Sequence, residues 1–168
     1  MKRIILNLQI VVQERVHLPT SDHFSRWLEA VLFFFKFKTS QEVTIRIVDP
    51  DESKALNWRY RRQNIATNIL SFPFEIPSIN DLKISLLGDL VICGSIVEKE
   101  AQEQQKRLRE HWAHMVIHGS LHLLGYDHIT LEHAKHMEVI ETQIMRNLGY
   151  SDPYKEISSS SISLKKNF

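Results

Sequence analysis

The sequence predicts one layered domain of the α+β or α/β class, with a four-stranded, mostly parallel mixed sheet and about five helices. Short segments with apolar residues at every second position alternate along the chain with longer segments whose apolar residues recur every three or four positions. These are the side-chain periods of strands and of helices. The length of 168 residues suits a single domain with one core.

The first predicted elements are a strand over residues 3–12 and a helix over residues 24–35. In the helix, aromatic and aliphatic residues follow helical spacing, which is typical of a core face rather than of a base-stacking surface. Ser21 or Asp22 can accept hydrogen bonds from the free amides of the first turn, so either is a candidate N-cap.

A second strand is predicted over residues 43–48, and a helix follows it directly. Pro50 suits the first helical position, Asp49 can accept hydrogen bonds from free backbone amides, and Glu52 stands where a capping-box partner is expected. This helix carries Arg61 near its end.

Two more strands are predicted over residues 69–72 and 86–92, the first ended by proline. Ser95 followed three residues later by Glu98 predicts a capping box for the next helix. The pattern over residues 96–124 permits one continuous helix.

The last regular helix is predicted to begin at Thr130 and to end at Gly149, because glycine readily adopts the left-handed backbone that closes a helix. Residues 156–168 are rich in serine and show no periodic apolar pattern. We therefore expect a disordered tail after a domain that spans residues 1–155.

Composition and charge exclude several classes of protein. The densest apolar run, residues 30–35, is far shorter than the ~20 residues that span a bilayer, so no membrane segment is expected. The single cysteine, Cys93, cannot form an internal disulfide, which fits a reducing cytoplasm. Lysine and arginine number 21 against 20 acidic residues, so any affinity for RNA must come from a local patch. There are two candidate patches: Lys54 with Arg59, Arg61 and Arg62, and Lys106 with Arg107 and Arg109. Solvent-exposed helix ends would explain either cluster equally well.

Three histidines have the spacing of a metal site. His118 and His122 lie four residues apart, so on a helix their imidazoles project from the same face. Gly125 then allows a turn that can bring His128 back toward them. Three protein ligands leave one position open, which is typical of catalytic rather than structural zinc. We therefore predict one Zn²⁺ per chain, although imidazole also suits nickel, copper or iron.

The residue that follows the first histidine limits the chemistry. In metalloproteases with this spacing it is a glutamate that acts as the general base, and here it is Gly119. Peptide hydrolysis by that route is therefore not expected. His114, one turn before His118, could line the cleft and shuttle protons, or could be an ordinary structural histidine. Asp127 could orient a ligand histidine or cap the following turn.

The histidine run is not the only recognisable motif. It resembles the signature of the YbeY family of bacterial rRNA maturation endoribonucleases, and other segments are similar to that family in the same order, over roughly residues 1–155. These segments are Leu56–Arg61, Thr67–Glu75, Leu87–Ile92, Leu148–Tyr150 and Asp152–Tyr154.

The resemblance implies a metal-dependent endoribonuclease, specific for single strands, that matures the 3′ end of 16S ribosomal RNA and acts in ribosome quality control. It implies that the three histidines bind the metal and that Arg61 is catalytic. It also implies a helix break near residues 105–108, before a central helix that carries two of the ligands. Relatives often have a glycine, a carboxylate and a proline just after the arginine, which residues 62–66 lack. The geometry of that loop is therefore open.

The same resemblance suggests partners, and two other functions remain open. It suggests contact with the small ribosomal subunit, with one of its proteins, and with an Era-type GTPase. A second hypothesis is a ribosome-assembly factor that binds rRNA and holds a structural zinc ion. A third is a metal-dependent hydrolase of small molecules or peptides. The sequence also leaves the proton acceptor open: a bound hydroxide could attack directly, or His114 or another residue of the cleft could take part. Attack by the RNA 2′-hydroxyl, which would leave cyclic phosphates on the products, is an alternative route.

Overall fold

The computed structural model describes residues 3–13, 16–74 and 84–155. Strands and helices follow one another in the predicted order, and the tail predicted over residues 156–168 lies outside the described residues. Along the chain the elements are β1 (Ile4–Val11), α1 (Ser21–Phe34), β2 (Ser40–Val48), α2 (Pro50–Arg61), β3 (Ile69–Pro73), β4 (Ile84–Cys93), α3 (Gly94–Glu103), α4 (Leu108–Leu123) and α5 (Leu131–Asn147).

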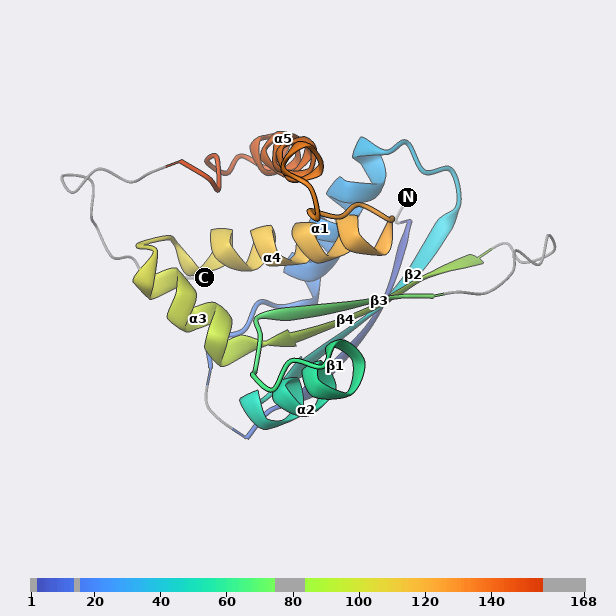
Figure 1. Ribbon diagram of the computed structural model, residues 1–168. Coiled ribbons are helices and arrows are strands. Elements are labelled where there is room, and N and C mark those ends of the chain that lie inside the picture. The colour runs from blue at the N-terminus through green and yellow to red at the C-terminus, as the bar shows by residue number, and fades with distance from the viewer. Residues whose placement is uncertain (1–2, 14–15, 75–83, 156–168) are drawn as a thin grey trace.

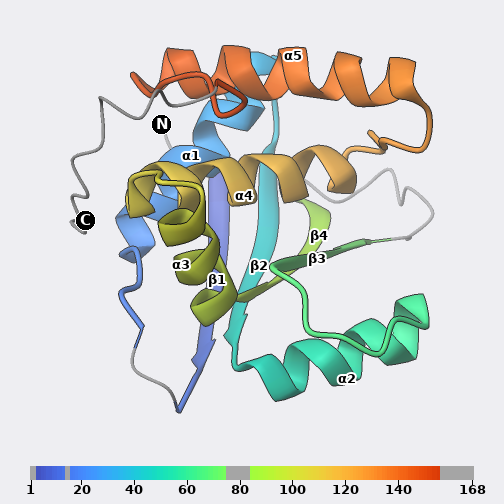
Figure 2. The same ribbon diagram turned by 60° about the vertical axis from the view of Figure 1, so that its left-hand side comes forward.

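The sheet is mixed and mostly parallel, as predicted. Its strand order is β1-β2-β4-β3, with β1, β2 and β4 parallel to one another and β3 antiparallel to β4. Strand β3 therefore lies at an edge of the sheet. Figures 1 and 2 show α4 between the sheet and α5, with α2 on the opposite face of the sheet. Helix α4 is thus the central helix of the fold.

Apolar side chains of β4 point alternately to the two faces of the sheet, and each face is covered by helices. Leu90 and Ile92 point into the main core, which α1, α4 and α5 close. Val91 and Cys93 point the other way, into a smaller apolar cluster that includes Leu56 of α2. A strand buried on both faces is typical of sheets with helices on both sides.

Helix α1 begins at Ser21, earlier than either predicted cap requires. Ser21 and Asp22 are not the N-cap, because Thr20 is: its hydroxyl accepts from the backbone N–H of His23 at 3.3 Å. In return, Nδ1 of His23 accepts from the backbone N–H of Thr20 at 3.1 Å. A histidine thus takes the place that glutamate or glutamine holds in a standard capping box.

Helix α2 begins as predicted, with Asp49 as N-cap and Pro50 as its first residue, but the predicted side-chain capping is wrong. Asp49 makes no side-chain cap hydrogen bond and instead accepts from the backbone N–H of Gln13 at 2.8 Å. Glu52 forms a two-pronged ion pair with Arg46 of β2, at 2.7 and 2.8 Å. Both carboxylates therefore bind groups that are distant in sequence or on another element, rather than the free amides at the start of α2.

The predicted break within residues 96–124 is confirmed. Helix α3 ends at Glu103, Gln105 has a left-handed backbone with φ 55°, and α4 begins at Leu108. The predicted capping box of Ser95 and Glu98 is wrong, because α3 starts directly after β4, at Gly94, and has no side-chain cap. Within the described ranges, no helix is long and apolar enough to cross a membrane.

Candidate metal centre and neighbouring arginine

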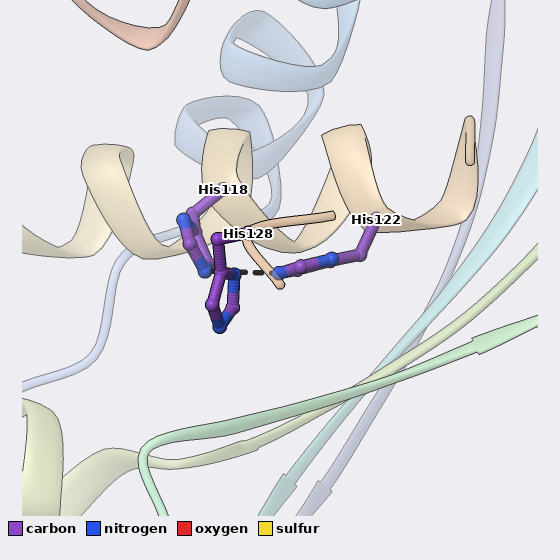
Figure 3. A group of neighbouring side chains, drawn as sticks. All are labelled: His118, His122 and His128. Atoms are coloured by element: carbon purple, nitrogen blue, oxygen red, sulfur yellow. Dashed lines mark hydrogen bonds between the residues drawn. The ribbon is translucent and has the colours of Figure 1, made fainter. Parts of the chain in front are cut away.

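The three histidines converge at one end of α4. His118 and His122 lie one turn apart on the helix, and Gly125, with φ +96°, turns the chain so that His128 returns toward them. One ring nitrogen from each lies within 4.8 Å of the others. Figure 3 shows the three rings pointing toward a common point. His128 is exposed and the other two are half-buried, so the group is open to solvent on one side.

Hydrogen bonds on the far side of two rings decide which nitrogens are free. Nδ1 of His122 lies 2.8 Å from the carbonyl oxygen of Tyr126, which can only accept, so Nδ1 carries the proton. Nδ1 of His118 likewise donates to Oε1 of Glu141 at 2.9 Å. In the neutral form of each ring Nε2 therefore carries no proton, and the two Nε2 atoms face each other at 3.1 Å, along the dashed line in Figure 3.

Two lone pairs at that distance repel, so two neutral rings in this arrangement need either a shared proton or a metal ion between or beside the two nitrogens. Metal ions bind the unprotonated nitrogen of imidazole, and burial together with the neighbouring His118 lowers the pKa of His122, which keeps its ring neutral. The donor set of three imidazoles suits zinc. The residues present therefore fit a metal ion with three protein ligands and an open position.

Glu141 of α5 is the residue that the sequence analysis missed. Its side chain is 1% exposed and accepts three hydrogen bonds, from Nδ1 of His118 at 2.9 Å, Nε2 of His114 at 2.5 Å and the hydroxyl of Tyr154 at 2.5 Å. Burial by itself would raise the pKa of Glu141, but the hydrogen bonds from His114 and His118 outweigh it and lower the pKa to about 2. Glu141 is thus a carboxylate that can only accept.

A signal for Glu141 was present in the sequence. It lies four residues after Met137 and three before Ile144, so it occupies the apolar stripe of α5 rather than its exposed face. A carboxylate inside such a stripe is almost never buried without partners. Its partners, however, come from another helix, and no local pattern identifies them.

His114 lies behind the three histidines rather than among them. It is 6% exposed, its Nε2 donates to Glu141, and its Nδ1 is buried with no hydrogen-bond partner among the described residues. Burial lowers the pKa of His114 more than Glu141 raises it, so the ring is neutral. His114 therefore holds Glu141 in place from the side opposite His118.

Tyr154 closes this buried group from the C-terminal side. Burial and the hydrogen bond to Glu141 raise the pKa of Tyr154, so its hydroxyl keeps its proton and donates. Two hydrogen bonds hold the segment around Tyr154: Nζ of Lys106 donates to the carbonyl of Pro153 at 2.6 Å, and Oδ1 of Asp152 accepts from the N–H of Tyr154 at 2.8 Å.

Arg61 is connected to α4 across the edge strand. Its Nη2 donates to the carbonyl oxygen of Ser71 in β3 at 3.0 Å, and its guanidinium lies 5.5 Å from the ring centre of Phe72. The hydroxyl of Ser71 in turn donates to the carbonyl of Gly119 at 3.1 Å. Two hydrogen bonds thus connect Arg61 to the residue that follows His118, although the two are far apart in sequence.

The structure explains why no base can follow the first histidine. A Cβ atom at Gly119 would lie 2.5 Å from Cδ1 of Ile69, 2.9 Å from Cδ2 of Leu90 and 3.1 Å from Oγ of Ser71. The position faces β3 and β4 at close range, so a glutamate there would enter the sheet rather than the site.

Of the two roles considered for Asp127, orienting a ligand histidine or capping the following turn, the structure shows the capping role. Its Oδ1 accepts from the backbone N–H of Ile129 at 3.4 Å and pairs with Nδ1 of His133 at 3.1 Å. These contacts stabilise the turn before α5.

Hydrogen bonds fix the loop after Arg61, although it lacks the glycine, the carboxylate and the proline that relatives often have there. Arg62 adopts the left-handed backbone, with φ 58°; its N–H donates to the carbonyl of Trp58 at 3.1 Å, and the N–H of Gln63 donates to the carbonyl of Asn57 at 3.3 Å. The side chain of Asn57 donates to the carbonyl of Ile65 at 2.8 Å and ties the loop to α2. An arginine thus occupies a position where glycine is usual.

Comparison with known proteins agrees with this arrangement. A family model described as endoribonuclease YbeY matches residues 10–149, which include Arg61, the three histidines and Glu141. Among solved structures, the fold is similar to the solution structure of TM1509 from Thermotoga maritima, with 26% identity and a TM-score of 0.51. The similarity covers 88% of this chain and 99% of that chain.

Proposed function

Because the chain belongs to the YbeY family of endoribonucleases, we propose that it cleaves single-stranded ribosomal RNA with the help of a zinc ion held by His118, His122 and His128. The family supports an endoribonuclease that acts in rRNA processing. The single observation that supports the metal is the convergence of one ring nitrogen from each of these histidines, with the Nε2 atoms of His118 and His122 only 3.1 Å apart.

Bound zinc would supply a Lewis acid that can polarise a phosphoryl oxygen and lower the pKa of water. The protein's part is to keep the ligand nitrogens unprotonated and correctly aimed. The Tyr126 carbonyl does this for His122 and the Glu141 carboxylate does it for His118. His114 and Tyr154 fix Glu141 in turn, so we propose that His114 contributes by positioning and does not touch the RNA.

Arg61 is proposed to bind the phosphate that is cleaved. One of its N–H groups is used on the carbonyl of Ser71, which fixes the guanidinium at the edge of β3 and leaves its other donors for a ligand. Guanidinium donors match phosphate oxygens in pairs and retain their charge at any physiological pH. Arg61 would therefore stabilise negative charge that grows on the phosphoryl oxygens during cleavage.

The cellular role that we propose is maturation of the 3′ end of 16S ribosomal RNA, together with ribosome quality control. It would take place in the cytoplasm on the small ribosomal subunit, with a small-subunit protein and an Era-type GTPase as partners. The support is the set of family motifs in matching order along the chain. The same motifs are compatible with an assembly factor that binds rRNA through its arginines and does not cleave it.

One experiment separates these two functions. Purified, zinc-loaded protein is incubated with matched single-stranded and duplex RNA, next to Arg61→Ala and His118→Ala variants whose folding is checked by circular dichroism. We expect cleavage of the single strand, its loss after chelation of the metal, its recovery with zinc, and strong losses in both variants. RNA binding without cleavage by the folded, zinc-loaded protein would favour the assembly factor. Cleavage at the wild-type rate by both variants would overturn the assignment of these residues.

A further inference from the structure

The end of α2 carries exposed aromatic side chains among cations. Trp58 and Tyr60 are each 51% exposed, although large aromatic rings usually contribute to a core. From Lys54 to Phe74 the chain has four lysine or arginine residues and no carboxylate. We call the exposed group formed by Trp58, Arg59, Tyr60 and Arg62 the α2 platform.

Each exposed ring of the α2 platform is paired with a guanidinium. The Cζ atom of Arg62 lies 5.7 Å from the ring centre of Trp58, and that of Arg59 lies 5.3 Å from the ring centre of Tyr60. Tyr60 also packs edge-on against Phe72 of β3, with ring centres 5.0 Å apart. The rings are thus held in place by neighbours while about half of their surface remains accessible to a ligand.

The backbone under the α2 platform is fixed by hydrogen bonds. Besides the contacts of Asn57 described above, the hydroxyl of Ser53 donates to the carbonyl of Thr67 and accepts from its N–H, both at 2.9 Å. The last turns of α2 and the loop that follows are therefore joined into one unit. A surface that is already ordered loses less conformational entropy when it binds a partner.

The α2 platform lies beside the proposed reaction site. Trp58 precedes Arg61 by three residues, and side chains at that spacing are neighbours on a helix. Arg61 in turn is connected through Ser71 to Gly119. Figure 2 shows the C-terminal ends of α2 and α4 at the same end of the molecule, with β3 between them. A strand whose phosphate binds Arg61 would have its adjacent nucleotides within reach of Trp58.

We propose that the α2 platform binds unpaired bases of the RNA substrate, with a base stacked on Trp58 and neighbouring phosphates held by Arg59 and Arg62. This inference rests on the proposed function and names the contact that would select single strands. Aromatic rings bind bases of any sequence through their π-faces, whereas arginines track the backbone. In a duplex both faces of each base are already stacked, so the same surface would bind duplex RNA more weakly.

The tryptophans of this chain make the proposal directly measurable. The chain has three, of which Trp27 and Trp112 are 0% exposed, so a ligand can contact only Trp58. A short single-stranded oligoribonucleotide is titrated into the zinc-loaded protein, and gel electrophoresis checks that it stays intact. We expect tryptophan fluorescence to be quenched by this strand, but much less by its duplex or by an abasic strand with the same phosphates. RNA binding, seen by fluorescence anisotropy, that leaves tryptophan fluorescence unchanged would overturn the proposal, as would equal quenching by the abasic strand.

Variants test whether the stacking contributes to affinity. Trp58→Ala is expected to raise the Kd for the single strand about 5- to 150-fold, because one stacked base contributes about 1–3 kcal/mol. Trp58→Phe keeps a ring and should recover part of the loss. Phe33→Ala is the matched control, since Phe33 on α1 is also an exposed aromatic, at 79%. Equal Kd values for Trp58→Ala and wild type would exclude the α2 platform as an RNA-binding surface and leave a protein partner as its occupant. Binding is measured without reference to cleavage, so loss of the nuclease assignment alone would not alter this result.

Discussion

The carboxylate of Glu141 lies 2.9 Å from Nδ1 of His118 and thereby directs the opposite nitrogen of that ring toward His122. Carboxylates in this position are common behind zinc-bound histidines, where they fix the ring orientation and raise the basicity of the ligand. The relationship makes Glu141 a positioning residue of the candidate metal centre. It is buried, it comes from a different helix, and it never needs to touch the RNA.

Replacing Glu141 with glutamine is expected to weaken zinc binding about 10- to 100-fold, which is the usual effect of losing such a partner. An amide offers one accepting oxygen where three donors converge, so the proton on Nδ1 of His118 is no longer secured. The affinity is measured by competition with a chromogenic zinc chelator. Glu138→Gln is the control, because Glu138 is exposed on the same helix, three residues earlier. Equal zinc affinity in Glu141→Gln and wild type would remove the positioning role.

Glu141 also predicts how the stability of the metal-free protein depends on pH. The pKa of Glu141 is about 2 in the folded protein, below its ordinary value of 4.5. Its contribution to stability is therefore fully present above pH 4.5 and is lost as the pH falls toward 2. The whole shift corresponds to about 3 kcal/mol. Urea denaturation of the metal-free protein at stepped pH should show a steeper loss of unfolding free energy below pH 4.5 for wild type than for Glu141→Gln. Parallel curves would mean that another group controls the acid transition.

Arg61 is expected to affect cleavage more than metal binding. Arg61→Ala should lower the single-turnover cleavage rate at saturating protein by about 10²- to 10³-fold, the usual effect of losing a donor to a developing negative charge. Arg61→Lys should recover only part of it, since an ammonium group cannot form paired hydrogen bonds with phosphate. Zinc content, measured by atomic emission, should remain that of wild type. Arg26→Ala, which removes an exposed arginine from α1, serves as the control. A normal cleavage rate in folded Arg61→Ala would exclude the proposed role.

Gly119 should not tolerate even a methyl group. Gly119→Ala is expected to lower the free energy of unfolding by about 1–3 kcal/mol, because overpacking against Ile69 and Leu90 exceeds the gain of about 1 kcal/mol that alanine brings to a helix. Chemical denaturation measures the difference. Gly94→Ala is the comparison, since a Cβ there would meet its nearest side-chain atoms at 3.3 Å, and a smaller effect is expected. Unchanged or increased stability of Gly119→Ala would show that β3 can move away from α4.

Local sequence patterns predicted most of the secondary structure and the three candidate ligands. The spacing of His118 and His122 follows from the helical repeat, and a glycine after the helix allows His128 to return, so an eleven-residue segment contains all of the information needed. The same kind of local rule predicted that the last helix begins at Thr130, which is the N-cap of α5 and accepts from the N–H of His133 at 3.1 Å. It was wrong at Glu52 and Ser95, where a tertiary ion pair and an immediate strand-to-helix junction replaced the local cap.

The sequence by itself determined the strands, the helices and the three histidines, because each depends on residues within a few turns of one another. Tertiary structure alone decided the strand order β1-β2-β4-β3, which places β3 at the edge where Arg61 can reach it. It also decided that α5 packs over α4, so that Glu141, 23 residues beyond His118, fixes the proton on that ring. Such pairings depend on how whole elements pack, and that is a balance of burial over the entire core rather than a property of any short segment.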